Sequence, residues 1–270
     1  IYEELQKICT ANIKNEIGRC TYTQMLNLDG GIEADLTVVC ISENHFRIIG
    51  AAATRERDKF HIKKHINSNI ELNDVTDEYV CLGVFGPKSR ELMNEISNDD
   101  FSNENFKFGY SKNVSIENKD IWVQRLSYVG EIGYELYIKF NEAKLIFDKI
   151  ISIGKKYNLS LCGAHAMDIL RMESGFLHWG HDISPEENQF EAGLKFAISF
   201  KKNFDFLGKD ALIKINQKKN KKKFLMLTLD NTKPGEPLAL HFEPIYIDGK
   251  ISGNTTSANY SFNYNKNLLF

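Results

Sequence analysis

The sequence of 270 residues lacks several signatures that would assign a function at once. No apolar stretch approaches the roughly 20 residues of a transmembrane helix, and no signal-peptide pattern opens the chain, so we expect no membrane partner. It has no G-x-G-x-x-G fingerprint and no Walker loop, and therefore no flavin- or nicotinamide-binding signature of its own. The formal net charge is only -2, so we expect no general attraction to nucleic acid.

The cysteines and histidines also lack the spacing of a metal or disulfide framework. The 5 cysteines form no C-x-x-C pair, which is typical of free thiols in a reducing compartment. We therefore expect a cytoplasmic protein, or one of the mitochondrial matrix in a eukaryote. His61 and His65 are four residues apart, but no third ligand accompanies them, so we expect surface histidines and no metal. His178, His181 and Asp182 lie close together without a nucleophile motif.

The chain is large enough for one large or two moderate domains, since 42% of its residues are hydrophobic. The basic run at 218–223 predicts a solvated linker between a first domain at 1–217 and a second at 218–270. The opening residues have the pattern of a helix interior, and the last four resemble the start of a strand. We therefore expect a fragment that is cut at both ends.

Hydrophobic spacing predicts a mixture of helices and strands. The expected helices are at 2–12, 55–66, 86–93, 143–157 and 164–174. The expected strands are at 21–26, 32–41, 46–49, 79–85, 121–128, 134–138, 224–229 and 244–247.

The most informative stretch is the hairpin predicted around Asp29-Gly30-Gly31. Glycine accepts a positive φ, so this tripeptide favours a tight turn between the two strands. The second strand alternates with a period of two, which places Asp35 and Thr37 side by side on one face. By the pattern alone this face either meets solvent or lines a cavity.

A second hairpin is predicted around residues 129–133. On its returning strand Glu135 and Tyr137 share one face, and the apolar residues at 134, 136 and 138 share the other. Glu131 lies in the turn, where we expect it to face solvent.

Both hairpins resemble the folate-binding aminomethyltransferase family, which includes the glycine-cleavage T-protein. The resemblance is carried by 22–27, 30–38 and 125–136, and it continues in order through nearly the whole chain. Tyr-Thr-Gln-Met-Leu-Asn at 22–27 and the segment 178–185 are most similar to the C-terminal half of dimethylglycine and sarcosine dehydrogenases. The implied fold is α+β, with three subdomains around a central folate channel. The first domain would lack its N-terminal strands, and the second would be a truncated β-barrel.

The resemblance also implies roles for particular residues. Asp35 matches the family's functional aspartate, which would manage protons at the reacting edge of tetrahydrofolate. Glu135 matches the carboxylate that would accept two hydrogen bonds from the pterin ring. Four further residues are implied as cofactor contacts: Tyr22, Thr37, Tyr128 and Phe196. At Met167 the chain departs from T-proteins, which carry an arginine there, while Arg171 and Glu173 match a structural Arg-x-Glu.

The implied reaction is transfer of a one-carbon unit from an oxidised small N-methyl amine, an iminium, to tetrahydrofolate, giving 5,10-methylenetetrahydrofolate. FAD would belong only to a flavoprotein domain fused upstream or present as a partner. Two alternatives are a stand-alone aminomethyltransferase acting on a lipoyl carrier protein and a non-catalytic folate-binding module. The sequence Gln-Met-Leu-Asn at 24–27 and Met167 count against the first alternative, and the presence of Asp35 counts against the second.

Overall fold

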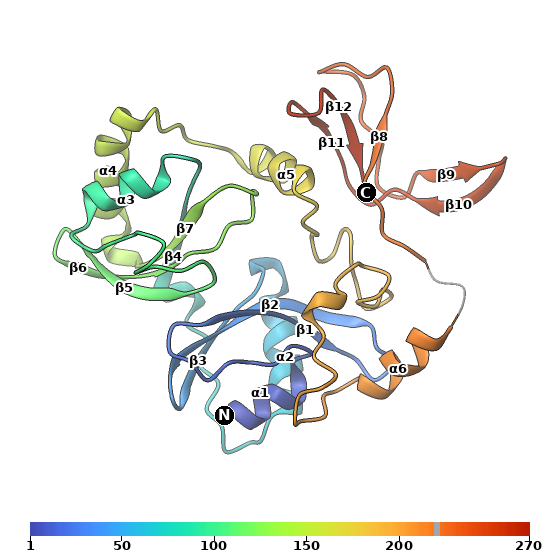
Figure 1. Ribbon diagram of the computed structural model, residues 1–270, viewed down its shortest axis with the longest axis horizontal. Coiled ribbons are helices and arrows are strands. Elements are labelled where there is room, and N and C mark those ends of the chain that lie inside the picture. The colour runs from blue at the N-terminus through green and yellow to red at the C-terminus, as the bar shows by residue number, and fades with distance from the viewer. Residues whose placement is uncertain (219–221) are drawn as a thin grey trace.

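The computed structural model of the chain describes residues 1–218 and 222–270 (Figure 1). A three-stranded sheet near the N-terminus is followed by a four-stranded sheet, a largely irregular segment and two small C-terminal sheets. None of the helices in the described residues is long and apolar enough to cross a membrane. Residues 219–221, half of the basic run predicted to be a linker, lie outside the described residues.

The N-terminal sheet consists of β1 (Cys20–Leu26), β2 (Ile32–Ser42) and β3 (His45–Ile49), paired antiparallel in that order. Gly30 has a φ of +87°, so the predicted glycine turn between β1 and β2 is confirmed. A Cβ at Gly31 would lie only 1.8 Å from the carbonyl oxygen of Pro185. Glycine is therefore required where a later loop presses on this turn.

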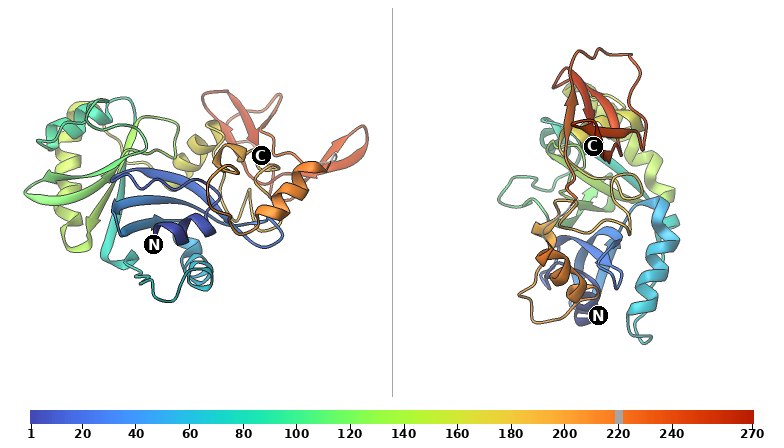
Figure 2. Two further views of the ribbon diagram at one scale, coloured as in Figure 1. Left: turned by 60° about the horizontal axis from the view of Figure 1, so that its bottom comes forward. Right: turned by 90° about the vertical axis from the view of Figure 1, so that its right-hand side faces the viewer.

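Two helices, α1 (Tyr2–Ile8) and α2 (Arg55–His65), pack on the N-terminal sheet (Figure 2). The buried cluster comprises Leu5, Ile8, Cys9, Ile13, Met25, Ala34, Leu36, Val38 and Ile62. The even-numbered residues of β2 thus face this core, and the odd-numbered ones face the other way. The predicted shared face of Asp35 and Thr37 is confirmed.

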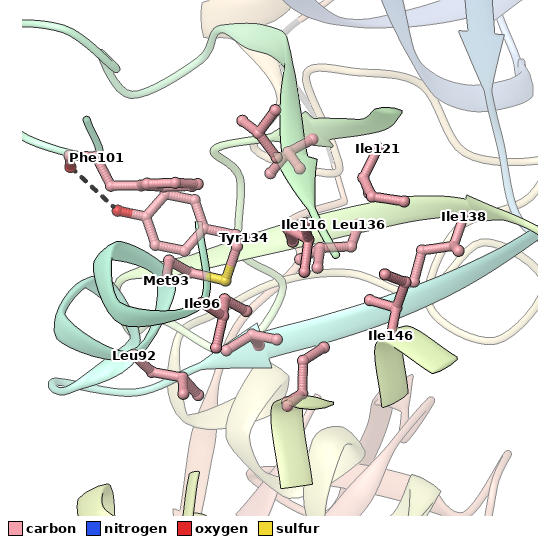
Figure 3. Close-up of a cluster of buried hydrophobic side chains, with 14 of the residues drawn as sticks. Leu92, Met93, Ile96, Phe101, Ile116, Ile121, Tyr134, Leu136, Ile138 and Ile146 are labelled. Carbon is pink, nitrogen blue, oxygen red and sulfur yellow. Dashed lines mark hydrogen bonds between the residues drawn. The ribbon is translucent and has the colours of Figure 1, made fainter. Parts of the chain in front are cut away.

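The four-stranded sheet has the antiparallel order β4-β7-β6-β5. Its strands are β4 (Tyr79–Phe85), β5 (Ser111–Ile116), β6 (Lys119–Gln124) and β7 (Gly133–Lys139). Helices α3 (Ser89–Ile96) and α4 (Ala143–Gly154) cover one face and enclose a large apolar core (Figure 3). In that core the Tyr134 hydroxyl donates to the carbonyl oxygen of Phe101 at 3.4 Å. Glu135 and Tyr137, one residue out of phase, lie on the opposite face.

That opposite face meets the N-terminal sheet. Cys20 and Val39 pack on Trp122, and the Cys20 Sγ donates to Gln124 Oε1 at 3.3 Å. Cys20 and Val39 lie on the same face of their sheet as Asp35, since the period along β2 is two. The Asp35 face and the Glu135 face are therefore turned toward each other.

The segment after α4 is mostly irregular and contains α5 (Ala164–Glu173) and α6 (Lys209–Gln217). Lys202 is buried in it, and its Nζ donates to the carbonyl oxygens of Gln6, Cys9 and Ala11 at 2.5, 2.5 and 3.0 Å. These are carbonyls at and beyond the end of α1, where a helix leaves its acceptors unpaired. The segment is thereby joined to the N-terminal sheet.

The C-terminal residues form one sheet of β8 (Leu227–Leu229), β12 (Lys266–Leu269) and β11 (Ala258–Ser261) and a separate hairpin of β9 (Pro244–Ile247) and β10 (Lys250–Asn254). The hairpin projects from the remainder of the molecule (Figure 2). The described strands form no closed barrel. The truncated barrel and the domain boundary at 217/218 stay predictions.

Several element boundaries differ from those expected. The first helix ends at Ile8 rather than at residue 12, because Cys9 is extended and forms a bridge with Met25. The helix expected from residue 86 begins at Ser89, after Gly86 with a φ of +121°. β6 ends at Gln124, so Tyr128 lies in the following loop and not on a strand. The strands β5 and β11 and the helix α6 were not predicted, whereas β12 lies where the last residues were expected to start a strand.

Candidate functional site

Asp35 lies half-buried on β2, directly opposite Gln24 of β1. Gln24 Nε2 donates to Asp35 Oδ1 at 2.7 Å. Burial raises the pKa of the Asp35 carboxyl, and hydrogen bonds from Tyr22 and Gln24 partly oppose that rise. Thr37 lies two residues further along the same face, opposite Tyr22. The N-terminal sheet therefore presents a carboxylate whose affinity for a proton exceeds that of an ordinary aspartate.

Gln24 is itself oriented by a residue that the sequence did not reveal. Gln189, which is fully buried, donates through Nε2 to Gln24 Oε1 at 2.5 Å and to Thr10 Oγ1 at 3.0 Å. This fixes the carbonyl side of the Gln24 amide toward Gln189 and its NH₂ group toward Asp35. Period-two spacing opposite Asp35 could have identified Gln24, whereas Gln189 lies in a distant irregular segment.

Glu135 lies on β7, with Gln124 of β6 and Gly83 of β4 as its neighbours. The Tyr137 hydroxyl donates to Glu135 Oε2 at 2.9 Å. Burial raises the pKa of the Glu135 carboxyl, an effect that the Tyr137 hydrogen bond partly opposes. Glu131, in the turn before β7, is exposed as predicted.

Glu135 and Tyr137 line a hollow of about 1000 Å³. The hollow extends along β3 and α2 to the N-terminus, and Ile49, Gly50 and Asp58 also line it. Its walls carry carboxylates from both sides, so they suit an occupant that donates hydrogen bonds.

Two aromatic pairs flank the site. Tyr128 stacks on Phe176 with ring centroids 6.0 Å apart, and its hydroxyl donates to the carbonyl oxygen of Leu177 at 2.7 Å. Tyr22 stacks on Phe196 at 6.1 Å, and Phe196 keeps 76% of its surface exposed. Burial raises the pKa of Tyr128 to about 12, and Asp35 is among the charges that add to this rise.

The structure thus brings five of the six predicted site residues into one neighbourhood: Asp35, Thr37, Tyr22, Phe196 and Tyr128. Glu135 belongs to the facing sheet and has its own set of contacts. Burial raises the pKa of Tyr22, and the charge of Asp35 and a hydrogen bond to its carboxylate add to that rise. Met167, on α5, is exposed over 43% of its surface.

The arginine motif on α5 serves a structural role. Arg171 is buried and donates through Nε to Asp168 at 2.7 Å and through Nη1 to Asp182 at 2.5 Å, so its partners are these aspartates and not Glu173. Glu173 instead accepts from Ser261 Oγ at 2.5 Å. The described residues contain no group of three or more side chains placed to hold a metal ion.

The expectation that both His61 and His65 lie on the surface was wrong for His61. His61 is only 8% exposed, because α2 turns that side toward the protein, and burial lowers its pKa to about 4. His65, by contrast, is half-buried.

The chain is similar in sequence to a protein family and to several named proteins. The family described as the GCVT N-terminal domain matches residues 2–202. The chain is 35% identical to 4-methylaminobutanoate oxidase (formaldehyde-forming) of Paenarthrobacter nicotinovorans, covering 96% of the chain and 31% of that protein. It is 33% identical to mitochondrial dimethylglycine dehydrogenase of Homo sapiens, covering 96% of the chain and 30% of that protein.

An aminomethyltransferase of Thermoanaerobacter pseudethanolicus is 33% identical, with 98% of the chain and 71% of that protein covered. The solved structure of glycine cleavage system aminomethyltransferase T from Bartonella henselae superposes with a TM-score of 0.81 at 22% identity, covering 99% of the chain and 72% of that structure. This likeness confirms a mixed helix and sheet fold of that type. The chain spans about a third of the length of the first two relatives, at 31% and 30%.

Proposed function

The chain belongs to the GCVT N-terminal domain family, and from this premise we propose that it binds tetrahydrofolate between its two facing sheets and passes a one-carbon unit to it. The product would be 5,10-methylenetetrahydrofolate. The observation that carries this proposal is the pair of half-buried carboxylates, Asp35 and Glu135, on sheet faces turned toward each other, with Glu135 lining a large hollow.

Glu135 fits the pterin end of such a ligand. The ring presents an N–H and an amino group side by side, and a carboxylate can accept both. Tyr137 occupies part of the acceptor capacity of Oε2 and holds the carboxylate in one orientation, leaving further lone pairs for the occupant of the hollow. Tyr128 and Phe196 supply aromatic surface near the opposite carboxylate.

Asp35 fits the reacting end. Tetrahydrofolate supplies the amine nitrogens that capture the one-carbon unit. These nitrogens must give up a proton during capture, and a carboxylate with a raised pKa accepts a proton more readily than an ordinary aspartate. Gln24 holds Asp35 Oδ1 in place, and Tyr22 lies at the same carboxylate. Thr37 completes the polar face.

We further propose the wider setting of a dimethylglycine or sarcosine dehydrogenase-like enzyme. A flavoprotein domain with FAD, fused upstream or present as a partner, would oxidise a small N-methyl amine, and the iminium would reach this domain. The support is similarity to dimethylglycine dehydrogenase and to 4-methylaminobutanoate oxidase, each about three times as long as the matched region. The compartment would be the cytoplasm or the mitochondrial matrix.

A stand-alone aminomethyltransferase is the second candidate. It is favoured by the Thermoanaerobacter relative, most of whose length the chain covers. Supplying the one-carbon unit from an aminomethylated lipoyl carrier protein, and separately from an oxidised N-methyl amine, would distinguish the two settings.

Calorimetry with tetrahydrofolate tests the proposal. We expect the purified protein to bind it, and Glu135→Gln to weaken binding by about 1.5–3 kcal/mol, the range for a charge-assisted hydrogen bond. Glu131→Gln is the matched control, because it removes the same charge from the exposed turn of the same hairpin. Equal affinity of the Glu135→Gln variant and the wild type would remove Glu135 from the pocket.

A further inference from the structure

A carboxylate on α2, Asp58, also lines the hollow. Asp58 is 8% exposed and lines the same hollow as Glu135 and Tyr137. Its Oδ2 accepts a hydrogen bond from Thr54 Oγ1 at 2.6 Å, whereas its Oδ1 is buried and has no hydrogen-bond partner among the described residues. Leaving a buried oxygen without a hydrogen-bond donor raises the free energy of the folded state. An occupant that donates a hydrogen bond to this oxygen would remove that cost.

The cations near Asp58 on α2 are engaged elsewhere. Arg57 pairs with Glu33 and lies over the ring of Trp179 at 5.0 Å. Lys59 pairs with Asp74 at 3.4 Å. Within residues 1–218 and 222–270 Asp58 therefore has no salt bridge, and its Oδ1 keeps its capacity to accept a hydrogen bond.

The backbone beside Asp58 is also adapted to it. A Cβ at Gly50 would lie 2.8 Å from Asp58 Oδ2, closer than real contacts allow. Gly50 directly follows β3 and itself lines the hollow. Any larger residue there would displace the carboxylate, so the glycine and the aspartate form one arrangement.

We propose that Asp58 accepts a hydrogen bond from a ring N–H that exists only in the reduced pterin, and so selects tetrahydrofolate over fully oxidised folate. This inference rests on the proposed function. Reduction of the ring adds hydrogens at N5 and N8, which turns two bare acceptors into donors. An ionised carboxylate can only accept, so it pairs with the reduced ring and faces a lone pair in the oxidised one. A site built for a donor rejects the analogue that lacks it, because buried polar groups are then left unpaired.

The roles of Glu135 and Asp58 can be separated experimentally. The pterin groups proposed to meet Glu135 are present in both oxidation states, so Glu135→Gln should weaken tetrahydrofolate and folic acid alike. Asp58→Asn should instead change the difference in affinity between tetrahydrofolate and folic acid. Its amide can donate to a bare ring nitrogen, and it keeps the shape and the Thr54 contact.

The test is calorimetry under anaerobic conditions with tetrahydrofolate and folic acid. It compares the wild type, Asp58→Asn, Asp58→Ala, Glu135→Gln and, as a control on the exposed side of the same helix, Glu56→Gln. We expect the wild type to prefer tetrahydrofolate and both Asp58 variants to reduce the ratio of the two dissociation constants at least tenfold. Glu56→Gln and Glu135→Gln should leave that ratio unchanged.

Two results would contradict the inference, and they have different consequences for the proposed function. If the wild type binds tetrahydrofolate but the Asp58 variants keep its full preference, Asp58 does not read the oxidation state while the proposed function stands. If the wild type binds neither folate, the proposed function and this inference both fail.

Discussion

At the scale of single residues, Asp35 is the end of a chain of side-chain hydrogen bonds that begins in a distant segment. Thr10, Gln189 and Gln24 lead in order to its Oδ1. Because each amide is fixed by the next, the donor facing Asp35 cannot be exchanged for an acceptor without breaking a buried bond. The carboxylate therefore has one prepared orientation, which is what proton transfer at a bound amine requires.

The first prediction at this scale concerns Asp35→Asn in the intact enzyme. The amide keeps the shape of the side chain but cannot take a proton, so formation of methylenetetrahydrofolate should fall by about 10²–10⁴-fold. Folate affinity should change by less than about tenfold, or 1.4 kcal/mol. Amine oxidation should continue and release free formaldehyde, and both products are measured side by side.

Asp29→Asn, in the exposed turn of the same hairpin, is the control for this substitution and should keep the wild-type partitioning. Unchanged partitioning in Asp35→Asn itself would show that Asp35 does not handle the proton.

Asp58 supports a second prediction, about stability. Burial raises its pKa to about 6, with Asp35 adding to the rise and Thr54 and Arg57 opposing it. Between about pH 4 and 6 the folded state then binds more protons at this group than the unfolded state, so its ionisation lowers the free energy of unfolding as the pH rises. Two pKa units correspond to at most about 3 kcal/mol.

Asp58→Asn removes this ionisation, so the variant should be about 1–3 kcal/mol more stable than the wild type at pH 7, and the gain should shrink as the pH falls to 4. Urea unfolding at several pH values measures the difference, in which the other titrating groups cancel. A constant difference across this range would show that the Asp58 pKa is not raised by folding. A gain in stability with a loss of selectivity is typical of a functional residue.

At the scale of elements, local signals were sufficient for the β1–β2 hairpin and insufficient for β5. The hairpin has a glycine turn and strict alternation, both of which are local. β5 is joined to β6 by Glu117 and Asn118, which have φ values of 52° and 57° without a glycine to mark the turn. It is also an edge strand with polar residues between its buried ones, so only pairing with β6 identifies it.

The same distinction applies to the candidate site. Asp35, Thr37 and Tyr22 could be placed together from period-two spacing and the resemblance, and the structure agrees. Asp58 could not be found that way, since it lies in a strongly charged helical sequence where an acidic residue is expected to face solvent. Its burial follows from the approach of Gly50, a contact that no local pattern encodes.

At the scale of the whole molecule, the C-terminal strands are tied to the site through one buried cation. Arg171 on α5 donates to Asp182, to the carbonyl oxygen of Phe176 at 3.1 Å and, through Nη2, to Ser257 Oγ at 2.8 Å. Asp182 also accepts from Thr256 and Ser257 at 2.6 and 2.7 Å. The loop between Arg171 and Asp182 carries Phe176, the stacking partner of Tyr128.

The last prediction follows from this connection. Arg171→Met leaves Asp182 buried without its cation, and breaking a buried pair in this way typically lowers the free energy of unfolding by 3–5 kcal/mol. Hydrogen exchange should accelerate in β11 and β12, and the Tyr128–Phe176 pair should loosen, so tetrahydrofolate affinity should fall although Arg171 is not proposed to touch the ligand. Lys266→Met is the matched control: its ion pair with Asp230 is in the same C-terminal sheet but exposed, so its loss should cost less than about 1 kcal/mol. Arg171→Lys keeps the charge without the planar fork and should recover only part of the stability. If Arg171→Met behaved like Lys266→Met in both stability and exchange, the C-terminal strands would be held by their other contacts, and Arg171 would not connect them to the site.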